Sequence, residues 1–148
     1  MQDAIQLVLV TPERQLLSES IVEVTLPGAE GQLGVLPGHA PLITEMGIGE
    51  LRYQTAGGTL SEAIVVIRGF AEVLRDRVTV LAETAERAEE IDVERAKAAL
   101  ARAEKRIATG LSSSEMDWER ATAALQRALV RLKVAEYLPR HSRTVPNP

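Results

Sequence analysis

Residues 78–107, VTVLAETAERAEEIDVERAKAALARAEKRI, contain the change of pattern that decides the fold. Up to about Leu81 apolar residues recur with a period of two, and Gly, Pro and Asp interrupt the runs, as in half-buried strands joined by tight turns. After Glu83 the interruptions stop, and Ala, Glu, Lys, Arg and Leu, which have high helix propensity, dominate. The sequence therefore predicts an all-β first half and a helical second half.

The predicted strands of the first half are short and alternate between apolar and polar residues. They comprise residues 5–9, 16–17, 22–26, 51–54, 63–67, 71–74 and 78–81. Many short strands at this spacing predict a β-sandwich or a barrel. The glycine-rich segment 28–34 is interpreted as turns with positive φ, because a β pattern surrounds it.

Two narrow apolar seams predict two helices. Apolar residues step alternately by three and four, at Val93, Ala96, Leu100, Ala103 and Ile107, and again at Trp118, Ala121, Leu125, Ala128, Leu132 and Ala135. Residues 109–114 are predicted to end the first helix and to begin the second, because Ser114 stands three residues before Asp117 as in a capping box. We expect an antiparallel two-helix hairpin.

Three segments follow from these patterns. Residues 1–86 form a β-sandwich domain, residues 87–138 a helical hairpin, and residues 139–148, with three prolines, a disordered tail. Because the seams contain more Ala than large residues, docking of the hairpin gains little free energy. We expect a hairpin that alternates between the sandwich and another surface, and a static appendage is the alternative.

Composition excludes several classes of protein. A net charge of −4 argues against nucleic-acid binding, and the absence of Cys excludes disulfides and thiolate metal sites. The two histidines, His39 and His141, are too far apart in the chain for a metal centre. The chain begins unlike a signal peptide and has no apolar run long enough for a spanning helix, so we expect membrane association only through partners.

Charged residues at the start of the first predicted helix form the candidate site. Asp92 is predicted to cap that helix, a role that needs no ligand. Arg95, one turn later, and Arg131 of the second helix could clamp an anion. The remaining basic residues form a solvated face or a face for acidic partner loops: Lys97, Arg102, Lys105, Arg106, Arg120 and Arg127. No motif of catalytic residues occurs, and His39 is interpreted as a turn residue that bonds its own loop.

Three motifs resemble those of the ATP synthase epsilon family. Residues 28–42, GAEGQLGVLPGHAPL, are similar to the family's sandwich signature, and residues 69–73, GFAEV, to the next one. Arg68 stands where the family usually has a second glycine. Residues 91–96, IDVERA, resemble the family's nucleotide motif, and all four defined positions match.

The resemblance implies ATP as a regulatory ligand and no required cofactor. Ile91 and Ala96 would line the adenine, Asp92 would accept a hydrogen bond from the base, and Glu86 would approach the base or ribose. Phosphates would be met by Arg95 and Arg131.

The resemblance also implies a non-catalytic rotor subunit of an F-type proton-translocating ATP synthase. The sandwich would bind the gamma subunit and the polar loops of the c-ring, with Glu30, Gly31, Gln32 and His39 as partner-binding residues. The hairpin would extend among the catalytic alpha and beta subunits and inhibit ATP hydrolysis. The protein would then be peripheral on the cytoplasmic face of the bacterial inner (plasma) membrane, or on an equivalent organelle membrane.

Two other functions compete with this interpretation. One is a free-standing nucleotide-sensing module, in which the sandwich is a scaffold. The other is an enzyme that uses Asp92 and Glu86 as a carboxylate pair, which an exposed helix start without a deep apolar pocket argues against.

Overall fold

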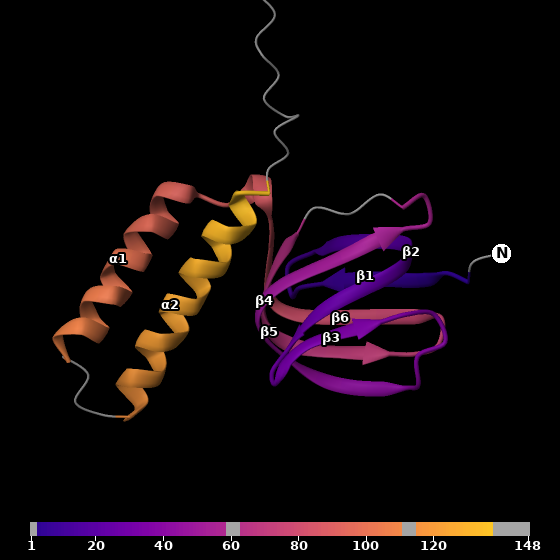
Figure 1. Cartoon of the computed structure of the whole chain (residues 1–148), viewed down its shortest axis with the longest axis horizontal. Coiled ribbons are helices and arrows are strands. Elements are labelled where there is room, and N and C mark those ends of the chain that lie inside the picture. The colour runs from indigo at the N-terminus through magenta and orange to yellow at the C-terminus, as the bar shows by residue number, and fades with distance from the viewer. Residues whose placement is uncertain (1–2, 59–62, 111–114, 138–148) are drawn as a thin grey trace, which may run out of the picture.

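The computed structural model describes residues 3–58, 63–110 and 115–137. These residues form a β domain followed by two helices that lie against one of its sides (Figure 1). The elements are β1 (Ile5–Val10), β2 (Gln15–Gly28), β3 (Gly31–Val35), β4 (Leu42–Thr55), β5 (Ile64–Val73), β6 (Arg77–Arg87), the 3-10 turn η1 (Ala88–Glu90), α1 (Val93–Thr109) and α2 (Glu115–Ala135). The predicted fold class, a β-sandwich followed by a helical hairpin, is confirmed.

The six described strands form one sheet that closes on itself. Their order is β1-β6-β5-β4-β2-β3, and β1 also pairs with β2. All these pairs are antiparallel except β1 with β6, which is parallel. The register between β2 and β4 shifts twice, and such irregularities bend long strands. The long strands can therefore contribute to both layers of the sandwich.

The interior of the sandwich is aliphatic, as the low aromatic content predicts. Its largest fully buried side chains are Ile5, Leu7, Leu9, Ile21, Leu26, Met46, Leu51 and Ile64, with several valines. The chain's single Phe, Phe70, is outside this core and 57% exposed. The phenylalanine of this chain therefore lies on the surface and not in the core.

Several strand boundaries differ from the prediction. Residues 31–35 of the glycine-rich segment form β3, and within residues 28–34 only Gly31 has positive φ. β4 begins at Leu42 instead of Leu51, and residues 64–73 form one strand. The helix-forming composition that begins after Glu83 does not form a helix at once: residues 84–87 continue β6, because they pair with β5 from Ile67 back to Ile64. Tertiary pairing has overridden the helix propensity of Ala and Glu there.

The hairpin has the predicted seam. α1 and α2 bury Ala96, Ala103, Ala121 and Ala128, and α1 ends at Gly110 in the left-handed conformation with φ 60°. Trp118, predicted in the seam, is instead half exposed. The predicted capping residue Ser114 and the predicted tail 139–148 lie outside the described residues.

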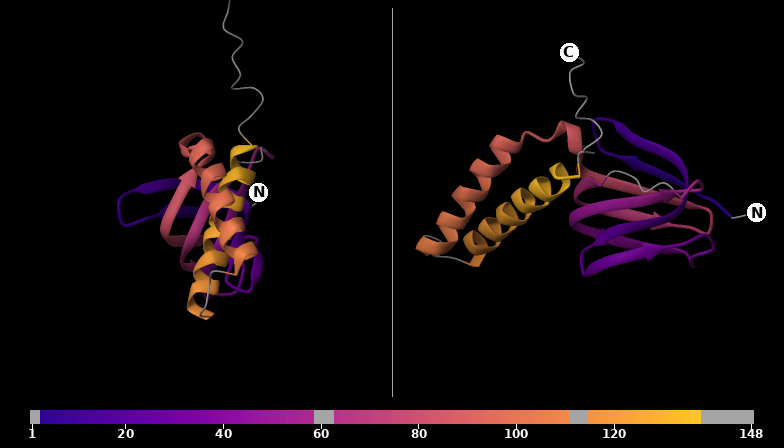
Figure 2. Two further views of the ribbon diagram at one scale, coloured as in Figure 1. Left: turned by 90° about the vertical axis from the view of Figure 1, so that its left-hand side faces the viewer. Right: turned by 45° about the horizontal axis from the view of Figure 1, so that its top comes forward.

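A second face of α2 packs on the sandwich. Val130 and Val134 form a buried cluster with Ala63, Val65 and Ile67 of the β5 region. α2 therefore lies between α1 and the sandwich, as the views in Figures 1 and 2 agree. Neither described helix has the length and apolar character needed to cross a membrane.

Candidate functional site

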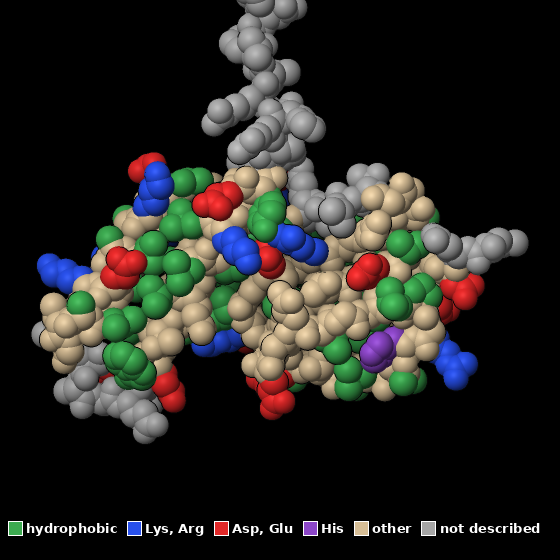
Figure 3. All heavy atoms as spheres, viewed as in Figure 1, with side chains coloured by type: hydrophobic (Ala, Val, Ile, Leu, Met, Phe, Trp, Pro, Cys, Tyr) green, Lys and Arg blue, Asp and Glu red, His purple; other side chains and the backbone are tan. Residues whose placement is uncertain are grey.

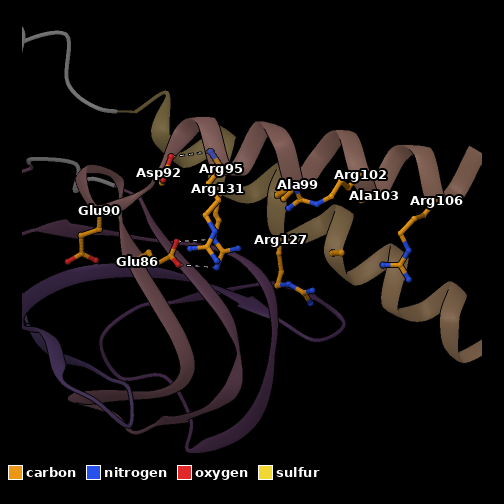
Figure 4. A pocket seen from close by; sticks show the side chains of 13 residues that line it. Glu86, Glu90, Asp92, Arg95, Ala99, Arg102, Ala103, Arg106, Arg127 and Arg131 are labelled. Carbon is orange, nitrogen blue, oxygen red and sulfur yellow. Dashed lines mark hydrogen bonds and ion pairs between the residues drawn. The ribbon is translucent and has the colours of Figure 1, made fainter.

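A hollow of about 610 Å³ lies where the two helices meet the end of the sandwich (Figure 4). Its lining comes from the end of β6, from η1 and from both helices: Glu86, Glu90, Asp92, Arg95, Ala96, Ala99, Arg102, Ala103, Arg106, Ala124, Arg127, Ala128 and Arg131. The structure thus brings together five of the six predicted nucleotide-site residues. The sixth, Ile91, is half-buried against the apolar cluster under α2.

Small side chains leave room for this hollow. Five of its lining residues are alanines, three on α1 and two on α2. The Ala-rich seam that lets the helices approach therefore also leaves space beside it that larger residues would fill.

Asp92 has the predicted capping role. Its Oδ1 accepts a hydrogen bond from the backbone N–H of Arg95 at 3.0 Å. The residue has an extended backbone and is exposed, while α1 begins at the next position. This bond satisfies one of the free amides of the first turn and orients the start of α1 toward the hollow.

Glu86 and Arg131 contact each other. The guanidinium donates from Nε to Oε2 and from Nη2 to Oε1, both at 2.9 Å, across the boundary between sandwich and hairpin. Both side chains are partly buried, so the bidentate pair is well formed. An anion that reaches Arg131 must displace Glu86 or share the guanidinium with it. Because Glu86 is paired and Asp92 is a cap, these two carboxylates do not form a catalytic pair in this structure.

The hollow carries an excess of positive charge. Five arginines and three carboxylates line it, a difference of two charges. In the part of the chain that the structure describes, Arg102, Arg106 and Arg127 make no ion pair or side-chain hydrogen bond. Burial lowers the pKa of Arg127, and the positive charges of Arg68 and Arg131 lower it further. Arg102 and Arg106 are exposed, in agreement with the predicted solvated basic face, whereas Arg127 is partly buried.

The spacing of the arginines in the sequence could have indicated that they line one site. Arg95, Arg102 and Arg106 are separated by seven and four residues, and Arg127 and Arg131 by four. Such spacings place side chains on one face of a helix. The antiparallel arrangement then directs both faces into the same hollow (Figure 4).

The segment that joins sandwich and hairpin is held by ion pairs. Arg14, in the turn between β1 and β2, donates two hydrogen bonds to the Glu90 carboxylate, at 2.7 and 2.6 Å. The hydrogen bond from Arg14 lowers the pKa of Glu90, aided by the N–H of Arg87. The Arg87 guanidinium also donates to the backbone oxygen of Leu16. η1 is thus fixed to the sandwich, and any hinge of the hairpin lies beyond Glu90.

The predicted partner-binding residues lie away from the hollow. Glu30, Gly31 and Gln32 are exposed at the β2–β3 turn and border a separate depression with residues 42–45. His39 lies in the next loop, where its Nδ1 is 2.7 Å from the backbone oxygen of Ala40. The predicted contact of His39 with its own loop is confirmed, and the depression does not include this residue.

Comparison with protein families matches both parts of the chain. Residues 4–88 match the family described as ATP synthase, Delta/Epsilon chain, beta-sandwich domain. Residues 89–136 match ATP synthase, Delta/Epsilon chain, long alpha-helix domain. The chain belongs to the ATP synthase delta/epsilon family. The resemblance inferred from the three motifs is thereby confirmed.

Individual members of the delta/epsilon family are similar over nearly the full chain. The ATP synthase epsilon chain of Syntrophobacter fumaroxidans is 52% identical over 136 residues, which are 92% of this chain and 98% of the relative. That of Citrifermentans bemidjiense is 49% identical over 135 residues, 91% of this chain and 96% of the relative. A chain of the Euglena gracilis mitochondrial ATP synthase, OSCP/F1/c-ring, has a TM-score of 0.75 and 28% identity, covering 90% of this chain and 81% of its own.

Proposed function

We propose that this chain is a non-catalytic central-stalk subunit of an F-type ATP synthase that restrains ATP hydrolysis through its hairpin. Membership of the family and similarity to epsilon chains support this assignment. The sandwich couples the gamma subunit to the polar loops of the c-ring, and the extended hairpin contacts the alpha and beta subunits. The protein is then peripheral on the cytoplasmic face of a bacterial inner membrane or on an equivalent organelle membrane, held there by the complex.

The hollow at the base of the hairpin supports regulation by ATP. Its volume of about 610 Å³ is in the range of small-molecule sites, about 300–1,000 Å³. Its excess of positive charge suits a triphosphate. Because its walls come from β6, η1 and both helices, a ligand there contacts residues that separate when the hairpin leaves.

Side chains along the hollow match the parts of the ligand in charge and polarity. The unpaired arginines Arg102 and Arg127 offer their guanidinium groups to phosphates, with Arg95 at the first turn of α1. Asp92 has a second carboxylate oxygen available for the base, beside Ala96. Arg131 contacts a phosphate only if its ion pair with Glu86 opens, or if its guanidinium binds Glu86 and the phosphate at the same time.

The energies of docking and of ligand binding are comparable. The apolar part of the docking surface is small, and a buried valine contributes about 1.5–3 kcal/mol. A ligand bound only by the docked state, at about 100 times its dissociation constant, adds about 2.7 kcal/mol. Changes in ATP concentration can therefore shift the position of the hairpin, as in other allosteric couplings of about 1–3 kcal/mol.

Titration calorimetry of the isolated protein tests the site. We expect saturable ATP binding by the wild type, and at least about tenfold weaker binding by Arg127→Ala, because a charged hydrogen bond contributes about 1.5–3 kcal/mol. Arg120→Ala is the matched control, since this exposed arginine of α2 does not line the hollow. ADP is titrated separately. Lack of wild-type binding at millimolar ATP would restrict the function to coupling and ATP-independent inhibition.

An exposed apolar face on the sandwich supports binding of the gamma subunit. Ile43, Phe70 and Leu81 of β4, β5 and β6 are 72%, 57% and 56% exposed. Phe70 lies opposite both Glu45 and Leu81, and Ile43 lies opposite Glu72. The face therefore combines a hydrophobic row with acidic neighbours, and it fits a protein surface with an apolar centre and basic edges. In Figure 3, hydrophobic side chains are visible on the helices and, in separate spots, on the part of the sandwich away from them.

Co-purification with a tagged gamma subunit tests this surface. Phe70→Lys should reduce recovery of the complex at least about tenfold, since Lys removes an apolar contact and repels basic edges, while Glu45 opposite keeps the strand pairing acceptable. Leu129→Lys on the hairpin, where the side chain is 48% exposed, should bind normally. Failure of the wild-type chain to bind gamma would favour a free-standing nucleotide sensor.

A further inference from the structure

Two charged residues of β4 lie on the face of the sheet that the hairpin covers. Ile48, Glu50 and Arg52 are two residues apart along the strand, so their side chains share one face. Ile48 packs against the apolar cluster under α2, and Glu50 lies opposite Val65, which belongs to that cluster. The charged groups of Glu50 and Arg52 are therefore placed beside α2.

The Glu50 carboxylate is nearly buried between two cations. Its side chain is 11% exposed, and Oε1 is 3.1 Å from Nζ of Lys133 on α2. Oε2 accepts a hydrogen bond from Nη2 of Arg52 at 3.3 Å. Ion pairs in full contact with solvent contribute little, whereas a desolvated carboxylate depends on its partners. Because Lys133 leaves with α2, Glu50 loses one of its two cations when the hairpin undocks.

The Arg52 guanidinium contacts the end of the hairpin. Its Cζ lies 4.1 Å from the ring centroid of Tyr137, which follows the end of α2, and this distance is within the range of a cation–π interaction. Among the described residues, the Nε of Arg52 is buried without a hydrogen-bond partner. Contacts with Glu50 and Tyr137 therefore account for the position of this side chain. Both charged groups of β4 thus contact the last turn of the hairpin or the residues just after it.

Two ion pairs lie on opposite sides of the apolar docking face of α2. Successive residues of an α-helix are about 100° apart around its axis, so Arg131 and Lys133 are each about 80° from the centre of the face that Val130 and Val134 form. Arg131 pairs with β6 on the side of the hollow, and Lys133 pairs with Glu50 of β4. Rotation of α2 about its axis would lengthen one of these pairs, so together they fix its orientation on the sandwich.

We propose that Glu50, Arg52, Lys133 and Tyr137 form a clasp that holds the C-terminal end of α2 on β4 and needs no nucleotide. None of the four residues lines the hollow, so a ligand there does not compete with the clasp. The clasp opposes release of the hairpin from the side of α2 that faces away from the hollow. This inference goes beyond the proposed regulation by ATP, because it concerns the docked state of the ligand-free chain.

Hydrogen-exchange protection factors of the ligand-free protein test the clasp. Glu50→Gln and Lys133→Gln should each lower protection in residues 128–135 about fivefold, because each removes the same partly buried ion pair. The double variant should also lose about fivefold and not about twenty-five-fold, since the effects of two changes to one contact are not additive. Lys97→Gln is the matched control, because it removes an exposed ion pair within α1 and should keep wild-type protection.

Tyr137 provides an independent arm of the test. Tyr137→Ala should lower protection in the same helix about threefold, whereas Tyr137→Phe should match the wild type, because the face of the ring is kept. Amides of β1 and β2 should be unchanged in every variant. Wild-type protection of α2 in Glu50→Gln, or a loss of about twenty-five-fold in the double variant, would overturn the clasp. The nucleotide site is tested separately by calorimetry, so its failure would leave this inference standing.

Discussion

Replacement of Val134 by aspartate should release the helical hairpin while the sandwich remains folded. Val134 is fully buried in the cluster that joins α2 to the β5 region. A buried, unpaired carboxylate costs several kcal/mol. The apolar docking contribution of Val130 and Val134 is about 3–6 kcal/mol in total, and partly exposed ion pairs add up to about 1 kcal/mol each. The substitution therefore cancels most of the docking free energy.

Hydrogen exchange and limited proteolysis distinguish release from unfolding. Exchange should accelerate by about two orders of magnitude or more in α1 and α2, whereas amides of β1, β2 and β6 keep their protection. Leu129→Asp on the same helix is the control, since its side chain is 48% exposed and should change little. Unfolding of both parts in a single transition would show that the hairpin is an integral part of one cooperative unit.

The docking face of the sandwich had a signal in the sequence that the period-two analysis did not use. Ala63, Ile64, Val65, Val66 and Ile67 form an uninterrupted apolar run, and all five are buried. A strand in which apolar and polar residues alternate has one face in solvent, whereas a continuous apolar run indicates that both faces of the strand are covered. Ile64 and Val66 face the sandwich core, and Val65 and Ile67 face α2. The run therefore predicts a covering element, although it does not identify which one.

The candidate site was predictable where its contacts are local. The cap formed by Asp92 and Arg95 spans three residues, and its spacing alone indicates it. Glu86 and Arg131 are 45 residues apart, and Arg14 and Glu90 are 76 apart. Such ion pairs depend on the orientation of the hairpin on the sandwich. Helix periodicity in the sequence does not determine that orientation. The sequence motifs thus indicated five of the residues that line the site, while the ion pairs required the three-dimensional arrangement.

Replacement of Gly69 by alanine should destabilise the sandwich strongly. Gly69 has φ of 127°, a conformation that L-residues rarely adopt. A Cβ there would lie 2.0 Å from the backbone oxygen of Leu81 and 2.9 Å from the Cα of Ala82. Both are backbone atoms of β6, so relief of the clash requires separation of the paired strands. We expect a loss of about 4 kcal/mol or more and a fall in Tm of about 15 °C or more.

Thermal and urea unfolding of Gly69→Ala beside Gly34→Ala measures this effect. Gly34 lies in β3, and a Cβ there meets nothing within 4 Å, so its replacement should change stability by less than about 1 kcal/mol. Comparison of the two variants distinguishes the destabilisation caused by the close approach of the strands at Gly69 from the general effect on stability of replacing a glycine in a strand. Equal stability of the two variants would mean that β5 and β6 are not held as closely at Gly69 as the structure shows. Loss of stability in Gly69→Ala alone would show that the close approach of β6 to β5 is what excludes a side chain at this position.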